Sequence, residues 1–144
     1  MRWRTPSVAL ATALALGLSV LTAPAALAAT PDHSIAEVQG TGASTPLAGQ
    51  TVTVEGVVTA DYRGVSNFRG LFIQSASPAG IAGASDGLFV YLNQANPAVS
   101  IGDLVTVTGV AGENGGQTQI TATAADQVTL VTAAVEVPAA VPLP

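Results

Sequence analysis

The 144-residue sequence contains no cysteine and no lysine, and His33 is its only histidine. Without cysteine, neither disulfides nor thiolate metal sites can form, so apolar packing must stabilise the fold. Catalytic sites that use a histidine pair are excluded, and a Ser-His-Asp triad would need His33 held firmly in a site. His33 lies in a short polar stretch, so we interpret it as a solvated side chain without a chemical role.

Basic residues are scarce: four arginines face nine acidic residues, and the net charge at pH 7 is −5. Nucleic-acid binding usually requires a basic surface, and an acidic chain repels polyanions at long range. The acidic residues form no D-x-D-x-D-G calcium loop, and their spacing indicates no carboxylate pair for glycosidase chemistry. A calcium site shared by two loops is an alternative, but we expect no metal, no cofactor and no catalytic residue.

The N-terminus has the layout of a secretory signal peptide. Arg2 and Arg4 give a basic start, residues 8–21 are apolar, and residues 26–28 (Ala-Leu-Ala) form a small-x-small cleavage site. We therefore predict that residues 1–28 are removed and that the remainder is secreted and extracellular, with no membrane segment. A retained membrane anchor is the alternative, but the apolar run is short for a bilayer span.

The longest β-type run is 50–62, in which apolar and polar residues alternate. Val52, Val54 and Val58 share one face, whereas threonine and glutamate side chains lie on the other, as in a half-buried strand. Gly56 interrupts the apolar face, and a glycine inside a strand often marks a bulge or bend. We therefore predict one long strand that bends at Gly56 and serves two sides of a curled sheet.

Shorter β-type segments flank this strand. A cluster of glycine and asparagine at 112–116 predicts a hairpin loop. Five to six short strands, with a proline-containing link after 87–92, favour an all-β fold: a small Greek-key barrel of the OB type. A β-sandwich is the alternative. The predicted shorter strands are 35–40 (an edge strand), 70–75, 87–92, 103–110, 117–121 and 128–132.

Four segments follow one another along the chain. The signal peptide (1–28) precedes a flexible tail at 29–34, the OB-like barrel domain at 35–132, and a Pro/Ala-rich linker at 133–144. Proline at near-alternate positions favours a stiff, extended spacer. A chain that ends in such a spacer suggests that something once followed it, or that it is a truncated product.

Aromatic residues provide the best candidate for a binding surface. If the aliphatic residues of the second and third barrel strands fill the interior, Phe72, Phe89 and Tyr91 lie on the outer face. OB barrels bind single strands on this face, where bases stack on rings and basic side chains meet phosphates. Arg63 and Arg69 flank the loop between the first two strands, next to this face. Alternatively, the rings pack beneath a loop or against another domain.

Five segments in this order carry a family resemblance: 46–59, 70–74, 85–91, 99–109 and 116–120. The chain resembles the OB-like domain at the N-terminus of large secreted bacterial nucleases, in which it precedes an endonuclease/exonuclease/phosphatase catalytic domain. The resemblance implies that hydrolysis belongs to the downstream domain, because its metal-binding acids and histidine pair have no counterpart here. It therefore implies a non-catalytic accessory module.

Three functional hypotheses remain open. The first is an accessory domain of an extracellular nuclease that binds single-stranded DNA or RNA. The second is a structural module that docks on, or spaces, a downstream catalytic nuclease domain. The third is a glycan-binding module of the cell wall. The candidate nucleic-acid-binding residues are Arg63, Arg69, Phe72, Phe89 and Tyr91.

Overall fold

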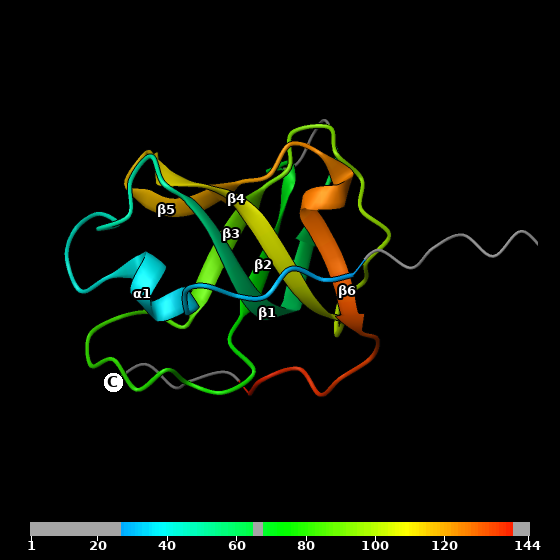
Figure 1. The fold of residues 1–144 in the computed structure, drawn as a ribbon, viewed down its shortest axis with the longest axis horizontal. Coiled ribbons are helices and arrows are strands. Elements are labelled where there is room, and N and C mark those ends of the chain that lie inside the picture. The colour runs from blue at the N-terminus through cyan, green and yellow to red at the C-terminus, as the bar shows by residue number, and fades with distance from the viewer. Residues whose placement is uncertain (1–26, 65–67, 140–144) are drawn as a thin grey trace, which may run out of the picture.

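Six strands and two short helical elements occupy the residues that the computed structural model describes, 27–64 and 68–139 (Figure 1). Residues 1–26, most of the predicted signal peptide, lie outside these ranges. The helical elements are α1 (Ile35–Gln39) and the 3₁₀ turn η1 (Ala125–Gln127). The strands are β1 (Thr51–Tyr62), β2 (Gly70–Gln74), β3 (Gly87–Tyr91), β4 (Leu104–Asn114), β5 (Gln117–Thr121) and β6 (Val128–Thr132).

The strands close into a barrel. Neighbours pair in the order β1-β2-β3-β5-β4, and β4 pairs in turn with β1. The β3–β5 pair is parallel, whereas the other pairs are antiparallel. This connectivity is that of the OB fold, so the predicted all-β, OB-like barrel is confirmed and the sandwich alternative is wrong. Strand β6 extends the sheet by pairing with β4.

Strand β1 serves two sides of the barrel, as its length predicted. Its first part pairs with β4 and its second part with β2. The bulge lies at Thr59 and not at Gly56, because the register with β2 shifts between Val58 and Ala60. One extra residue turns all the side chains that follow it to the opposite face. The bulge therefore places Tyr62 on the outside of the barrel.

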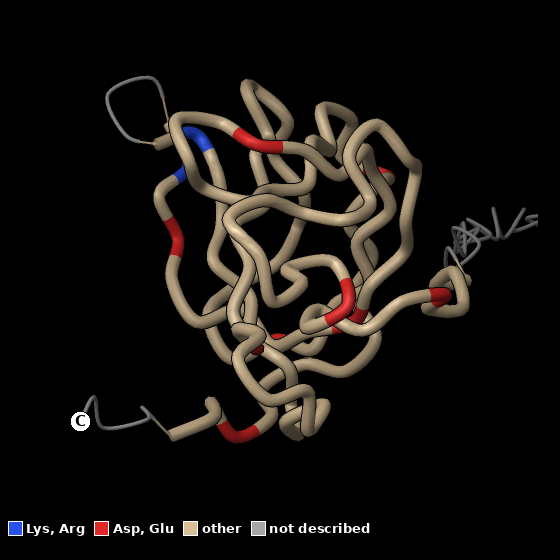
Figure 2. The backbone as a smooth tube through the Cα atoms, turned by 90° about the vertical axis from the view of Figure 1, so that its left-hand side faces the viewer, with Lys and Arg blue, Asp and Glu red and all other residues tan. Residues whose placement is uncertain are grey.

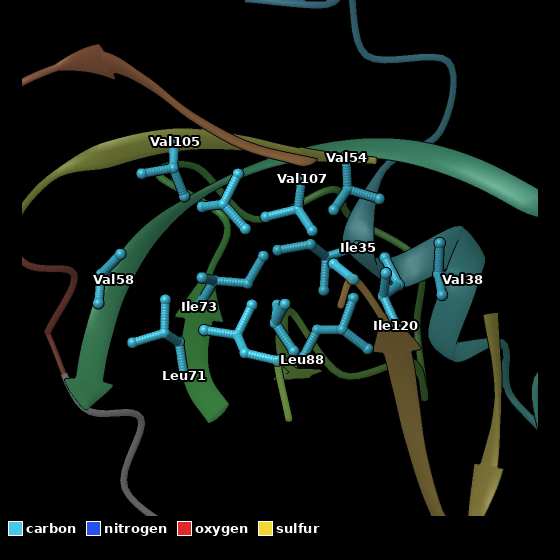
Figure 3. Packing of buried hydrophobic residues seen from close by; sticks show 14 of the residues in the cluster. Ile35, Val38, Val54, Val58, Leu71, Ile73, Leu88, Val105, Val107 and Ile120 are labelled. Carbon is cyan, nitrogen blue, oxygen red and sulfur yellow. The ribbon is translucent and has the colours of Figure 1, made fainter. Parts of the chain in front are cut away.

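Residues 35–39 form helix α1 and not the predicted edge strand. The Ser34 hydroxyl accepts from the Glu37 N–H at 3.2 Å, and the Glu37 carboxylate accepts from the Ser34 N–H at 2.7 Å. This reciprocal capping box satisfies donors that a helix leaves open at its N-terminus. The helix buries Ile35 and Val38 completely, at one end of the barrel interior (Figure 3).

Gly56 makes room for this helix. A Cβ atom at Gly56 would lie 3.0 Å from Cδ1 of Ile35 and 3.2 Å from Cβ of Ile73. Both distances are shorter than ordinary carbon–carbon contacts, and a packed interior has little freedom to yield. Gly56 thus allows α1 to pack closely against β1. The irregularity in the pairing of β1 lies instead at Thr59.

The barrel interior is filled by aliphatic side chains, because the inward positions of the strands carry valine, leucine and isoleucine (Figure 3). Such interiors are packed to the density of organic crystals and leave no room for a ligand. Any binding site of this barrel must therefore lie on its outer face or its rim. The labelled core residues from strands are Val54, Val58, Leu71, Ile73, Leu88, Val105, Val107 and Ile120.

The predicted flexible tail, 29–34, includes residues that are fastened to β1. The N–H groups of Asp32 and His33 donate to the Thr53 carbonyl at 3.0 and 3.2 Å. The Asp32 carboxylate in turn accepts from the Thr53 N–H at 2.7 Å. Asp32 and His33 are therefore bound to the barrel and do not form a free tail.

The start of the predicted linker, 133–144, is also fastened to the barrel. The Val135 N–H donates to the Gly102 carbonyl at 2.8 Å. The Ala134 N–H donates to the carboxylate of Asp103, which is itself buried, at 3.0 Å. The linker thus begins on the barrel surface, and its last residues, 140–144, lie outside the described ranges.

Candidate nucleic-acid interface

Four aromatic rings touch one another in sequence across the outside of β1, β2 and β3; we name them the aromatic row. Tyr62 contacts Phe68 edge-on, with ring centres 5.4 Å apart, and Phe72 edge-on at 5.9 Å. Phe72 and Phe89 follow at 4.9 Å with a tilt of 47°. Phe68 is 68% exposed and Tyr62 40% exposed, whereas Phe89 is only 6% exposed. The row therefore offers two rings to a ligand at one end and is buried at the other.

Tyr62 and Phe68 were missing from the predicted site. Uninterrupted alternation along β1 places Tyr62 inside the barrel with Val58, and only the bulge at Thr59 reverses this. Phe68 lies in a connection, where hydrophobic periodicity predicts nothing. The one available sequence signal was the gathering of two aromatic residues and two arginines within 62–69.

Phe72 and Phe89 lie on the outer face, as predicted, but Phe89 is not available for stacking. Its ring covers Gly70 of the adjacent strand: a Cβ there would lie 2.5 Å from Cζ of Phe89 and within 2.2 Å of the Val90 carbonyl oxygen. Phe89 therefore supports Phe72 from the side. A groove of about 640 Å³ continues from both rings between the glycine-rich loops before β1 and before β3.

Tyr91 lies on the outer face but beside the aromatic row. Its hydroxyl is 3.4 Å from Oδ1 of Asn93. Its other neighbours in a shallow depression include Gln119, whose Nε2 donates to the Thr121 hydroxyl at 3.3 Å. Oε1 of Gln119 is buried and has no partner among the described residues. Tyr91 thus belongs to a more polar part of the face than predicted.

Arg63, which we predicted to contact phosphate, has its donors engaged by the protein itself. Its Nε donates to both carboxylate oxygens of Asp61, at 2.9 and 3.0 Å. Its terminal nitrogens donate to Oδ1 of Asn96 at 3.0 Å and to the carbonyls of Pro97 and Val99 at 2.6 and 2.9 Å. The side chain therefore ties the end of β1 to the connection between β3 and β4.

The ion pair between Asp61 and Arg63 shifts the pKa of both groups. The hydrogen bonds from Arg63 hold the pKa of Asp61 below its ordinary value, despite some desolvation. The same contact raises the pKa of Arg63. Both shifts favour the charged pair, so Asp61 neutralises most of the positive charge that Arg63 would offer a phosphate.

Arg69 is the cation that the structure presents at this face. Its backbone has φ 61°, and is held by hydrogen bonds from its N–H to Tyr62 and from the Leu92 N–H to its carbonyl, at 2.9 and 2.8 Å. Its guanidinium approaches Oδ1 of Asn93 at 3.4 Å. Arg63 and Arg69 line one cleft of about 470 Å³. The basic positions lie together at one edge of the molecule, whereas the acidic ones are spread over it (Figure 2).

The described residues contain no cluster of side chains that could bind a metal ion. Within 27–64 and 68–139, no three His, Cys, Asp or Glu side chains are arranged so that they could hold a metal ion. No helix in these ranges is long and apolar enough to span a membrane. The arrangement provides ring surfaces and a cationic cleft, which are means of binding.

The comparisons with known proteins found likeness among solved structures. No protein family and no curated protein matches the sequence. One similar solved structure is an OBody, AM1L10, bound to hen egg-white lysozyme; it has a TM-score of 0.49 and 21% sequence identity, and the match covers 74% of this chain and 99% of the OBody chain. The assignment of the OB fold rests on the strand pairings described above.

Proposed function

We propose that this chain is a secreted, non-catalytic OB-type accessory domain of an extracellular nuclease, and that it binds single-stranded DNA or RNA. The observation that carries the proposal is the aromatic row, which ends in two exposed rings on the strand face that OB barrels use for single strands. Every base has a flat face that can stack on such rings, so the row suits a ligand of any sequence.

Stacking supplies most of the affinity in this proposal. Each stacked base contributes about 1–3 kcal/mol, and the two exposed rings, Phe68 and Tyr62, accommodate about two bases. Of the two arginines that the structure describes, Arg69 has donors to spare for a phosphate, because Arg63 is engaged by Asp61 and two carbonyls. The nine carboxylates oppose further phosphate contacts. We therefore expect weak binding that depends little on salt.

A docking role is the second candidate, and the exposure of Phe68 favours it. An exposed apolar ring that continues into other rings is typical of a surface that another protein covers. In this version the aromatic row would pack on a catalytic nuclease domain. The two candidates make opposite predictions for the isolated chain: only the first expects it to bind oligonucleotides.

Phe68→Ala is expected to weaken binding of a fluorescently labelled single strand of about ten thymidines by roughly ten-fold, because one stacking surface is lost. Fluorescence anisotropy at low salt measures the dissociation constant. Because Phe68 is 68% exposed, its removal should leave the unfolding temperature nearly unchanged. The logarithm of the affinity should fall with the logarithm of salt with a slope of about −0.7, as expected for one phosphate contact.

The matched control is Leu130→Ala, which removes a side chain that is 42% exposed on β6, a strand that pairs with β4 alone. It should bind the oligonucleotide as the parent chain does. An absence of binding at near-millimolar protein would contradict the nucleic-acid proposal and leave the docking candidate. Retention of the chain on insoluble cell wall without oligonucleotide binding would instead favour the glycan-binding hypothesis.

A further inference from the structure

The cleft beside Phe68 gathers the positive charge of the described chain. Its lining consists of Arg63, Gly64, Arg69 and residues 93–96, that is, two arginines, two asparagines, a glutamine, an alanine and a glycine. Among the described residues no carboxylate belongs to this lining, although Asp61 pairs with Arg63 beside it. The other hydrogen-bonding side chains that line the cleft in this part of the chain are neutral amides. The cleft is thus suited to an anion, in contrast to the acidic surface around it.

Arg69 is held in position to use this cleft. Arg69 and Asn93 both adopt left-handed backbone conformations, with φ 61° and 55°. Non-glycine residues keep this conformation only where the surroundings hold them in it. The backbone of Arg69 is fixed by two backbone hydrogen bonds, one to Tyr62 and one from Leu92. The backbone of Arg69 is therefore fixed beside Asn93, whose Oδ1 lies 3.4 Å from its guanidinium.

The guanidinium of Arg69 has unused donor capacity. Within the described residues it has no ion pair, and the ion pair at this edge joins Arg63 to Asp61. Its contact with Oδ1 of Asn93, at 3.4 Å, is at the long limit for a hydrogen bond. A guanidinium has five N–H donors in a fork that matches two oxygens of a phosphate. The guanidinium of Arg69 can therefore donate to one anionic group without breaking a strong contact.

We propose that this cleft binds the terminal phosphate of a single-stranded nucleic acid, so that the domain recognises phosphorylated ends. The inference rests on the proposed function. It specifies that the cleft beside Phe68 recognises the terminal phosphate of the strand. Phe68 directly precedes Arg69, so their Cα atoms lie about 3.8 Å apart. In this proposal the terminal base stacks on Phe68 and its phosphate binds the guanidinium of Arg69. A terminal phosphate carries a charge of about −1.5 to −2, compared with −1 for a phosphodiester.

The charge distribution explains why an end would be preferred over the middle of a strand. A single strand laid along the rest of the face brings internal phosphates towards an acidic protein and gains no further arginine. At the end of a strand, the most highly charged phosphate meets the cleft that Arg63 and Arg69 line. A ligand with one charged end and a stackable base thus fits this surface better than an evenly charged polymer does.

The test compares three oligonucleotides of one sequence, about ten nucleotides long, that carry a 5′-phosphate, a 3′-phosphate or hydroxyls at both ends. For the full chain at low salt, one of the two phosphorylated strands should bind about ten-fold more tightly than the hydroxyl-ended strand, because it gains a charge-assisted, bidentate hydrogen bond. Arg69→Gln should remove this difference, so that it binds the three strands with equal affinity. Arg69→Lys, which retains the charge without the fork, should retain part of the difference.

The outcomes separate the inference from the function on which it rests. Equal affinities of the three strands for the parent chain would overturn the inference and leave the proposed function standing. A difference that persists in a folded Arg69→Gln variant would overturn the assignment to this cleft. Failure of all three strands to bind would contradict the proposed function and the inference together.

Discussion

Gly70→Ala is expected to lower the free energy of unfolding by roughly 3 kcal/mol or more, at the upper end of what overpacking costs. A Cβ at this position would lie 2.2 Å from the Val90 carbonyl oxygen and 2.5 Å from Cζ of Phe89. The first contact is with backbone and cannot be relieved by a side-chain rotation. Relief therefore requires β2 and β3 to separate, which also displaces Phe72. Urea unfolding followed by circular dichroism measures the loss.

Gly112→Ala is the matched control for this effect. Gly112 also lies within a strand, β4, but a Cβ there would have no atom within 4 Å. This substitution should change the stability by no more than about 0.5 kcal/mol, and it should be neutral or stabilising because alanine restricts the unfolded chain. Equal stabilities of the two variants would show that Phe89 does not lie over Gly70.

Arg63→Gln is expected to cost about 2 kcal/mol, whereas Arg69→Gln should cost less than about 0.5 kcal/mol. The reason is the difference in their partners. Arg63 holds Asp61 and the carbonyls of Pro97 and Val99, and these acceptors lose their donor in the variant. Arg69 makes one long side-chain contact. Thermal unfolding of the two variants side by side measures the difference, and equal losses would contradict a scaffold role for Arg63.

Stability should also fall at low pH because of Asp61. Its pKa in the folded chain lies below the ordinary value of 3.8, because Arg63 donates to its carboxylate. The carboxylate of Asp61 therefore binds a proton less readily in the folded state than in the unfolded chain. Its contribution to the free energy of unfolding is present above the unfolded pKa, about pH 4, and is lost as the pH falls through the folded pKa. Asp61→Asn should show a smaller decrease of the unfolding temperature between pH 5 and pH 2. An identical decrease in both proteins would exclude Asp61 as a source of the pH dependence.

Alternation of apolar and polar residues predicted the strands well, because a side-chain period of two is a local property of an extended chain. The run at 50–62 became β1, and the segments around Ile73, Val90 and Val107 became β2, β3 and β4. Residues 35–39 did not follow this rule. A short segment with a capping box has no room to show helical periodicity, and the choice between helix and strand is made by the cap and by the burial of Ile35.

The candidate site was predicted less completely than the fold. Phe72 and Phe89 were placed on the correct face, since this required only their position within a strand. The availability of a side chain depends instead on its neighbours from distant parts of the sequence. Phe89 is covered because it packs on Gly70, and Arg63 is engaged because Asn96, Pro97 and Val99 approach it.

By itself the sequence determined that this protein is an all-β barrel with an aliphatic interior and few cations. These properties depend on composition and on patterns between near neighbours in the chain. Only the tertiary structure decided that the bulge at Thr59 brings Tyr62 to the outer face, and that Arg69, not Arg63, offers its donors. The pairing register and long-range contacts decide these points, and no local pattern encodes them.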